Sequence, residues 1–176
     1  MSYVHRTGPV RTIHVIMVAT LVMLGSVRCT RDSPTTPSRT TTVITLRSDP
    51  GDYIGQGQTY QYTRANANIA VSATGGHLVV EINGDQFWLG NVLLPSSQTR
   101  FKRGMSADVR RFPFQDRAVG GLDWSGEGRG CNTLTGWFAV DHATYSEDAL
   151  TAIELRFEQH CEGEAPALRG AIRWEQ

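Results

Sequence analysis

The 176-residue sequence lacks an excess of charge of either sign, because 17 Lys and Arg residues are balanced by 17 Asp and Glu residues. A general nucleic-acid-binding protein needs a basic surface, so this balance argues against that function. The sequence also lacks long stretches of apolar residues at helical spacing, and no segment repeats with a fixed period. These absences disfavour a helical fold, a solenoid and a propeller. The length suits one domain.

No apolar run is long enough for a permanent membrane span, which needs about 20 residues. One apolar stretch, from Ile13 to Val27, has 15 residues and includes a histidine and a threonine. It follows two arginines and precedes Cys29. This order is typical of a secretory signal peptide, so we predict a signal peptide over residues 1–28 and an exported protein.

Cys29 stands where a bacterial lipoprotein signal places its lipid-modified residue, although Arg28 occupies a position that such signals give to a small side chain. Lipidation of Cys29, an uncleaved short anchor and cleavage near Ser26 all stay open. Residues 30–42 are polar apart from two prolines. They cannot bury enough surface to offset an ordering entropy of about 1–2 kcal/mol per residue. We therefore expect residues 29–42 to form a Ser/Thr/Pro-rich tether that places the protein in the cell envelope or outside the cell, anchored by lipid.

From residue 43 onward, short segments with alternating apolar and polar residues are separated by turn residues. Candidate strands follow one another at spacings of about 8–12 residues. They cover residues 42–46, 58–63, 68–73, 77–83, 86–89, 106–112, 133–145, 150–159 and 168–174. This pattern predicts an all-β domain over residues 43–176, an antiparallel, jelly-roll-like β-sandwich of about nine strands. A closed β-barrel is the alternative.

The sequence has only three cysteines, an odd number that leaves one over in an exported protein. With Cys29 lipidated or removed, Cys131 and Cys161 form a pair that closes a loop of 30 residues. Such a disulfide contributes about 3–4 kcal/mol. The competing interpretation makes Cys161 a nucleophile or a metal ligand together with His160. Neighbouring strand residues point to opposite faces, however, so we predict that Cys161 faces the core and His160 faces solvent.

Residues 120–133 contain five glycines interleaved with charged and polar residues. The segment lacks the Gly-Lys-Ser/Thr ending of a phosphate loop and precedes no predicted helix, so nucleotide binding is disfavoured. If the disulfide forms, its ends bring this segment close to the outward face of residues 153–161. We therefore predict a ligand surface, with a rigid glycine-rich turn as the alternative. Its candidate residues are Glu127, Arg129, Asn132, Glu158 and His160.

Two carboxylates near a histidine also suit an envelope hydrolase, in which Glu127 and Glu158 form the acid/base pair. No motif assigns a catalytic residue, and no cofactor is expected. Asp49 and Asp52 are calcium candidates, although two acids three residues apart in a turn are common without metal. No His/Cys set has zinc spacing. An exposed row among the tryptophans and tyrosines would suit carbohydrate stacking, with core positions as the alternative.

Three segments resemble signatures of an uncharacterised module in exported bacterial proteins. They are SDPGDYIGQGQTY at 48–60, GEGRGCNTLTG at 126–136 and FEQHCEG at 157–163. The resemblance spans about residues 45–174, implies a mobile extracellular module without established activity, and supports the pairing of Cys131 with Cys161. We therefore expect a lipid-tethered envelope binding or structural module rather than an enzyme. Its expected partner is an envelope carbohydrate or another surface protein.

Overall fold

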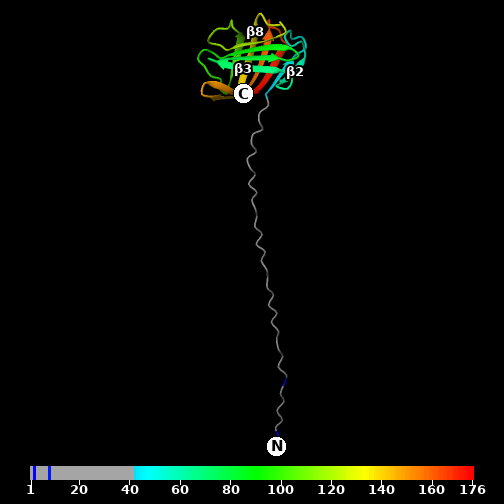
Figure 1. Ribbon diagram of the computed structural model, residues 1–176, viewed down its shortest axis with the longest axis vertical. Helices are drawn as coiled ribbons and strands as arrows, with labels where there is room; N and C mark the ends of the chain where they lie inside the picture. The colour runs from blue at the N-terminus through cyan, green and yellow to red at the C-terminus, as the bar shows by residue number, and fades with distance from the viewer. Residues whose placement is uncertain (1, 3–7, 9–41) are drawn as a thin grey trace. The chain divides into compact units, whose positions relative to one another are not determined.

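The computed structural model describes residues 2, 8 and 42–176 (Figure 1). Apart from residues 2, 8 and 42, the predicted signal peptide and tether, Cys29 included, therefore lie outside the described residues. Ten strands follow in chain order, and the described part of the chain contains no helix. The strands are β1 (Val43–Ser48), β2 (Thr59–Thr63), β3 (Asn68–Thr74), β4 (His77–Asn83), β5 (Phe87–Leu93), β6 (Gly104–Arg111), β7 (Gly121–Gly126), β8 (Leu134–Ser146), β9 (Ala149–Cys161) and β10 (Ala167–Glu175).

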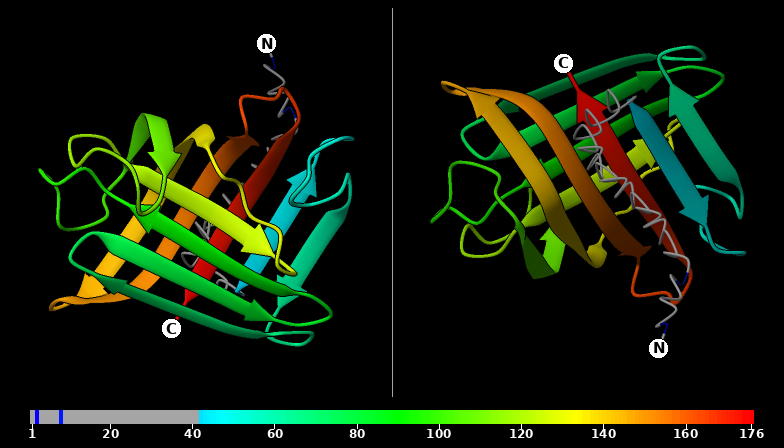
Figure 2. Two further views of the ribbon diagram at one scale, coloured as in Figure 1. Left: turned by 90° about the horizontal axis from the view of Figure 1, so that it is seen from above. Right: turned by 90° about the horizontal axis from the view of Figure 1, so that it is seen from below.

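All ten strands belong to one sheet, in the order β2-β1-β10-β9-β8-β6-β7-β5-β4-β3. Strand β6 pairs antiparallel with β8 and parallel with β7, and the other neighbours are antiparallel. Figure 2 shows the sheet folding over on itself, so that the half from β2 to β8 covers the half from β6 to β3 with crossing strands. The predicted all-β class is confirmed. The barrel alternative describes this single, nearly closed sheet better than the two separate sheets of a sandwich.

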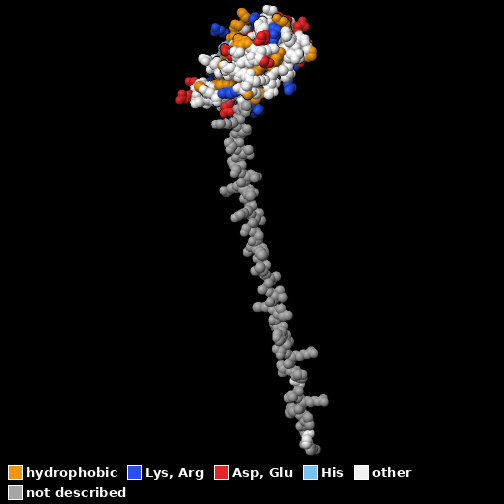
Figure 3. Space-filling model, turned by 45° about the vertical axis from the view of Figure 1, so that its right-hand side comes forward, with side chains coloured by type: hydrophobic (Ala, Val, Ile, Leu, Met, Phe, Trp, Pro, Cys, Tyr) orange, Lys and Arg blue, Asp and Glu red, His pale blue; other side chains and the backbone are white. Residues whose placement is uncertain are grey.

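The core lies between the two halves of the sheet and is filled from alternate strand positions. In β9, Ile153, Leu155, Phe157 and Cys161 are buried, whereas Arg156 is exposed and Glu154, Glu158 and His160 are half-buried. The predicted inward and outward faces of this strand are therefore confirmed. On the outside, acidic and basic side chains are interspersed over the face seen in Figure 3.

Side chains join the edge strand β2 to the opposite half of the sheet. The indole Nε1 of Trp88 in β5 donates a hydrogen bond of 2.9 Å to the hydroxyl of Tyr62 in β2. The ring of Tyr60 packs edge-on against Trp88, with 4.9 Å between the ring centroids. Burial is the main cause that raises the pKa of Tyr62 to about 12. The sheet is thus closed at this edge by aromatic packing.

Strand β7 was not predicted, because its sequence is rich in glycine. In the register between β5 and β7, Gly90 stands opposite Trp124 and Gly126 stands opposite Trp88. A Cβ atom on Gly90 would lie 2.1 Å from Cζ3 of Trp124, and one on Gly126 would lie 2.5 Å from Cε3 of Trp88. The glycines therefore leave room for the indole rings of the neighbouring strand. This packing outweighs the weak strand preference of glycine, and the predicted glycine-rich turn is shorter than expected.

Candidate functional site

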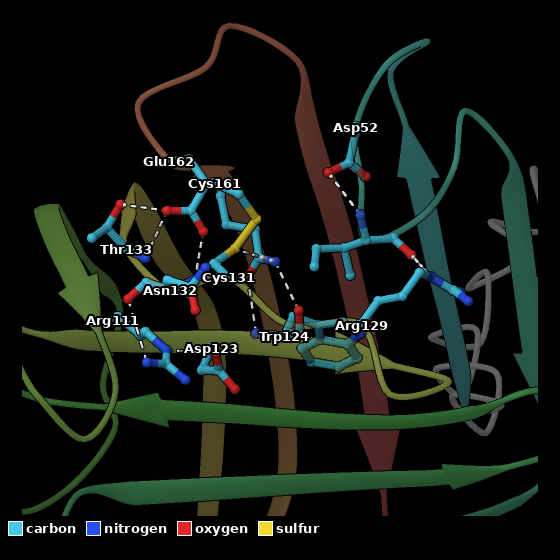
Figure 4. The surroundings of a disulfide bond; sticks show 12 residues. Asp52, Arg111, Asp123, Trp124, Arg129, Cys131, Asn132, Thr133, Cys161 and Glu162 are labelled. Atoms are coloured by element: carbon cyan, nitrogen blue, oxygen red, sulfur yellow. Dashed lines mark hydrogen bonds and ion pairs between the residues drawn. A yellow bond between two sulfur atoms is a disulfide. The ribbon is translucent and has the colours of Figure 1, made fainter.

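Cys131 and Cys161 form the predicted disulfide, with 5.0 Å between their Cα atoms. It links the loop before β8 to the end of β9 (Figure 4). Beside it, the carboxylate of Glu162 accepts hydrogen bonds from the backbone N–H groups of Asn132 at 2.5 Å and Thr133 at 3.3 Å. These bonds, led by that from Asn132, lower the pKa of Glu162. The disulfide and this carboxylate together fix the segment that follows β7.

Gln159 holds β7 against β9 from inside the core. Its side chain is fully buried, its Oε1 accepts from the N–H of Trp124 at 2.9 Å, and its Nε2 donates to the carbonyl of Trp124 at 2.8 Å. The side-chain amide therefore replaces a neighbouring strand at this position of β7. A glutamine at an inward-facing position of β9 was the sequence signal for this contact, and it was missed.

Two of the predicted ligand residues, Glu158 and His160, lie together on the outer face of β9. The Nε2 atom of His160 is 3.2 Å from Oε1 of Glu158, and Nε of Arg169 donates to Oε2 of Glu158 at 2.6 Å. Burial alone would raise the pKa of Glu158, but the hydrogen bonds from His160 and Arg169 outweigh it and lower that pKa. This carboxylate is therefore held charged by its neighbours.

Glu127 and Arg129 lie elsewhere, in the turn that follows β7. The carboxylate of Glu127 accepts a hydrogen bond of 2.6 Å from the N–H of Phe87, and Nε of Arg129 donates to the carbonyl of Ile54 at 2.8 Å. Because Gln159 points inward to β7, its neighbour Glu158 points away from β7. The structure therefore separates the predicted ligand residues into two groups: Glu127 and Arg129 in the turn after β7, and Glu158 and His160 on the outer face of β9. The contacts of the two carboxylates lend no support to the hydrolase alternative, which stays a prediction.

The carboxylates of both calcium candidates, Asp49 and Asp52, accept hydrogen bonds from other groups of the protein. Asp49 accepts hydrogen bonds from Arg169 at 2.6 Å and from the N–H of Ala167 at 3.1 Å. Asp52 accepts from Ser48 at 2.7 Å and from the N–H of Gly55 at 2.8 Å. Within residues 42–176, no group of three or more His, Cys, Asp or Glu residues is placed to hold a metal ion.

A hollow of about 310 Å³ lies over the outer face of β5 and β7 and includes the turn with Glu127 and Arg129. Its lining also contains Phe87, Leu89, Arg111, Asp123 and Ser125. Phe87 is 45% exposed and presents an apolar ring at this hollow. The hollow therefore combines one accessible aromatic ring with charged groups and a glycine-rich backbone.

Arg111 and Asp123 meet in this hollow without a hydrogen bond between them, and Figure 4 shows them side by side. Nε of Arg111 lies 3.9 Å from Oδ1 of Asp123. That Nε is buried and has no hydrogen-bond partner among the described residues. The side chain of Asp123 is only 17% exposed, and burial raises its pKa despite the nearby guanidinium. The side chain of Arg111 as a whole is 34% exposed, so a hydroxyl group can accept from its guanidinium and donate to this carboxylate, and both groups suit one polar ligand.

Sequence reasoning missed this pair because its members come from different strands. The parallel pairing of β6 and β7 places Arg111 opposite Leu122, next to Asp123. The alternation of β7, with Leu122 and Trp124 buried, turns Asp123 to the outer face. The position of Asp123 between two core residues indicates an outward, half-buried carboxylate, but the local sequence does not indicate that Arg111 is its partner.

Neither a protein-family model, nor a curated protein, nor a solved structure matches this chain significantly. The resemblance to an uncharacterised exported module therefore stays a prediction. In the part of the chain that the structure describes, no helix is long and apolar enough to cross a membrane.

Proposed function

We propose that this protein is an exported, lipid-tethered module of the cell envelope that binds carbohydrate in the hollow over β5 and β7. The observation that carries the proposal is the pair of Asp123 and Arg111, an acceptor and a donor 3.9 Å apart without hydrogen bonds to each other. Sugar hydroxyl groups both donate and accept, so they satisfy such a pair. The exposed ring of Phe87 offers a surface for the apolar face of a sugar.

Export is supported by the signal-like pattern before Cys29 and by the disulfide between Cys131 and Cys161, since disulfides persist in oxidising compartments. Lipid attachment at Cys29 would hold the domain at a membrane surface through the polar segment that follows. Labelling cells with a fatty-acid probe tests this tether. The wild-type protein is expected to take up the label and the Cys29→Ala variant to lose it; equal labelling would contradict the tether.

Replacing Asp123 with asparagine tests the binding site. The variant keeps the shape but loses the charged acceptor, and hydrogen bonds to charged groups contribute about 1.5–3 kcal/mol. A glycan array first identifies the neutral oligosaccharides that the wild-type protein binds. We expect the variant to bind these oligosaccharides at least tenfold more weakly. Asp148→Asn is the matched control, because this acid is fully exposed on the β8–β9 hairpin.

The same variant is expected to be more stable than the wild type at pH 7. Because burial raises the pKa of Asp123 above 3.8, the folded protein binds the proton more tightly than the unfolded chain does. The contribution of Asp123 to wild-type stability therefore falls as the pH rises from 3.8 through the folded pKa, and the asparagine variant avoids this loss. Urea unfolding at pH 4 and pH 7 measures the difference.

Unchanged glycan binding by Asp123→Asn would refute the proposed site.

A further inference from the structure

The two strands at the ends of the sheet, β2 and β3, differ in how their outer edges are protected. The side chain of Asn66 covers the edge of β2: its Oδ1 accepts from the N–H of Thr63 at 2.7 Å, and its Nδ2 donates to the carbonyl of Gln61 at 2.9 Å. Strand β3 is the last strand of its half of the sheet (Figure 2). Among the described residues it pairs with β4 alone, and no hydrogen bond reaches its other edge.

The hairpin of β3 and β4 defines which backbone groups of β3 lie on this free edge. Its turn consists of Gly75 and Gly76, with φ angles of 58° and 83°, and joins Thr74 to His77. The residues that flank such a turn are hydrogen-bonded to each other, and bonded and non-bonded pairs then alternate along the antiparallel strands. The N–H and C=O groups that point away from β4 are therefore those of Ile69, Val71 and Ala73.

Strand β3 lacks the features that prevent edge strands from pairing with another chain. Its seven residues, NIAVSAT, include no charged side chain and no proline, and its register with β4 contains no bulge. Its exposed outer face carries only short, uncharged side chains, those of Asn68, Ala70, Ser72 and Thr74. A hollow of about 410 Å³ borders Ala73 and Thr74, so there is open space beside this end of the strand. The edge can therefore accept a further strand.

We infer that β3 is a dimerisation edge, which pairs antiparallel with β3 of a second copy of this chain. A twofold axis at Val71 lets this residue exchange both backbone hydrogen bonds with Val71 of the second copy. The same axis sets the other pairs: Ile69 with Ala73, Ala70 with Ser72, and Asn68 with Thr74. None of these pairs brings two charges together, so the strand is complementary to itself. The inference is independent of the carbohydrate hollow, since no residue of β3 lines that hollow.

Sedimentation velocity over a series of protein concentrations tests the inference, with Cys29→Ala in every chain so that the full chain is studied without lipid. The wild-type strand is expected to give a monomer–dimer equilibrium. Ala70→Lys/Ser72→Lys places lysines of the two copies directly opposite each other, and like charges in this position are destabilising. We expect its dimer to dissociate at least tenfold more readily, and the same of Ala70→Glu/Ser72→Glu. A mixture of the two variants should form heterodimers as tightly as the wild type, because each lysine then faces a glutamate.

The matched control is Thr59→Lys/Gln61→Lys, which adds the same charges at exposed positions of β2, the edge that Asn66 covers. It should leave the dimer unchanged. Amide hydrogen exchange identifies the edge that pairs. The amide of Val71 should become protected as the protein concentration rises, whereas the amide of Ser72, which faces β4, should be protected at every concentration.

Three results would overturn the inference. One is a wild-type strand that stays monomeric throughout the series. Another is a double-lysine variant that dimerises as tightly as the wild type. The third is a dimer in which the amide of Val71 stays unprotected, which would show that another surface pairs. Dimerisation needs no glycan and should be unchanged in Asp123→Asn, so failure of this edge and failure of the carbohydrate site give different results.

Discussion

Replacing Gly90 with alanine is expected to lower the free energy of unfolding by about 3 kcal/mol, at the upper end of the range for overpacked cores. The new Cβ atom would lie 2.1 Å from Cζ3 and 2.2 Å from Cε3 of Trp124. This indole is fully buried and is stacked on Phe157, with 4.8 Å between ring centroids. Its backbone is also held by Gln159. The ring therefore has no free space into which it can move.

Urea unfolding followed by tryptophan fluorescence measures this loss. Gly104→Ala is the matched control, because the nearest atom to its new Cβ would be a backbone oxygen at 3.8 Å. The control is expected to change stability by less than about 0.5 kcal/mol. If Gly90→Ala unfolds at the same urea concentration as Gly104→Ala, the close packing of glycine against tryptophan between β5 and β7 is wrong.

Replacing Gln159 with leucine is expected to cost about 3 kcal/mol as well. Leucine fits the apolar core but leaves the N–H and the carbonyl of Trp124 without the partners that Gln159 provides. Each unsatisfied buried group costs about 1–3 kcal/mol. Since β7 also carries Asp123, loosening this strand should also weaken the proposed carbohydrate binding.

Amide hydrogen exchange at Trp124 distinguishes this effect from a general loss of packing. In Gln159→Leu, the amide of Trp124 should exchange much faster than amides in β4, whose strand bonds are unchanged. Gln61→Leu changes an exposed glutamine of β2 and should leave exchange and stability near wild type. Unchanged protection of the Trp124 amide in Gln159→Leu would show that the side-chain amide does not stabilise β7.

The strand pattern could be predicted from the sequence because it depends on local alternation, and the disulfide because three cysteines with Cys29 set aside leave one pair. Cys161 has the same parity as Leu155 and Phe157, so its inward direction followed from β9 alone. Strand β7 could not be predicted in this way. Its Gly126 makes room for the ring of Trp88 on β5, and that requirement depends on a register between strands that are distant in the sequence.

The candidate site was predictable only in part, for the same reason. The glycine-rich segment was singled out as a ligand surface, and its turn residues Glu127 and Arg129 line a hollow. Their predicted neighbours, Glu158 and His160, lie on the other side of β9. Asp123 gained its partner Arg111 through the one parallel pairing in the sheet, which links β6 to β7. Local sequence carries no signal for such a pairing.

If Arg111 and Asp123 together hold a carbohydrate hydroxyl, as we propose, the Nε–Hε resonance of Arg111 reports on that contact most directly. In a nuclear magnetic resonance titration with a neutral oligosaccharide selected on the array, this resonance should shift until it saturates. The dissociation constant from this shift should equal the one measured for the whole protein. The corresponding resonance of Arg117 should not move. An oligosaccharide that binds and saturates the protein while the Arg111 resonance stays unchanged would contradict the account.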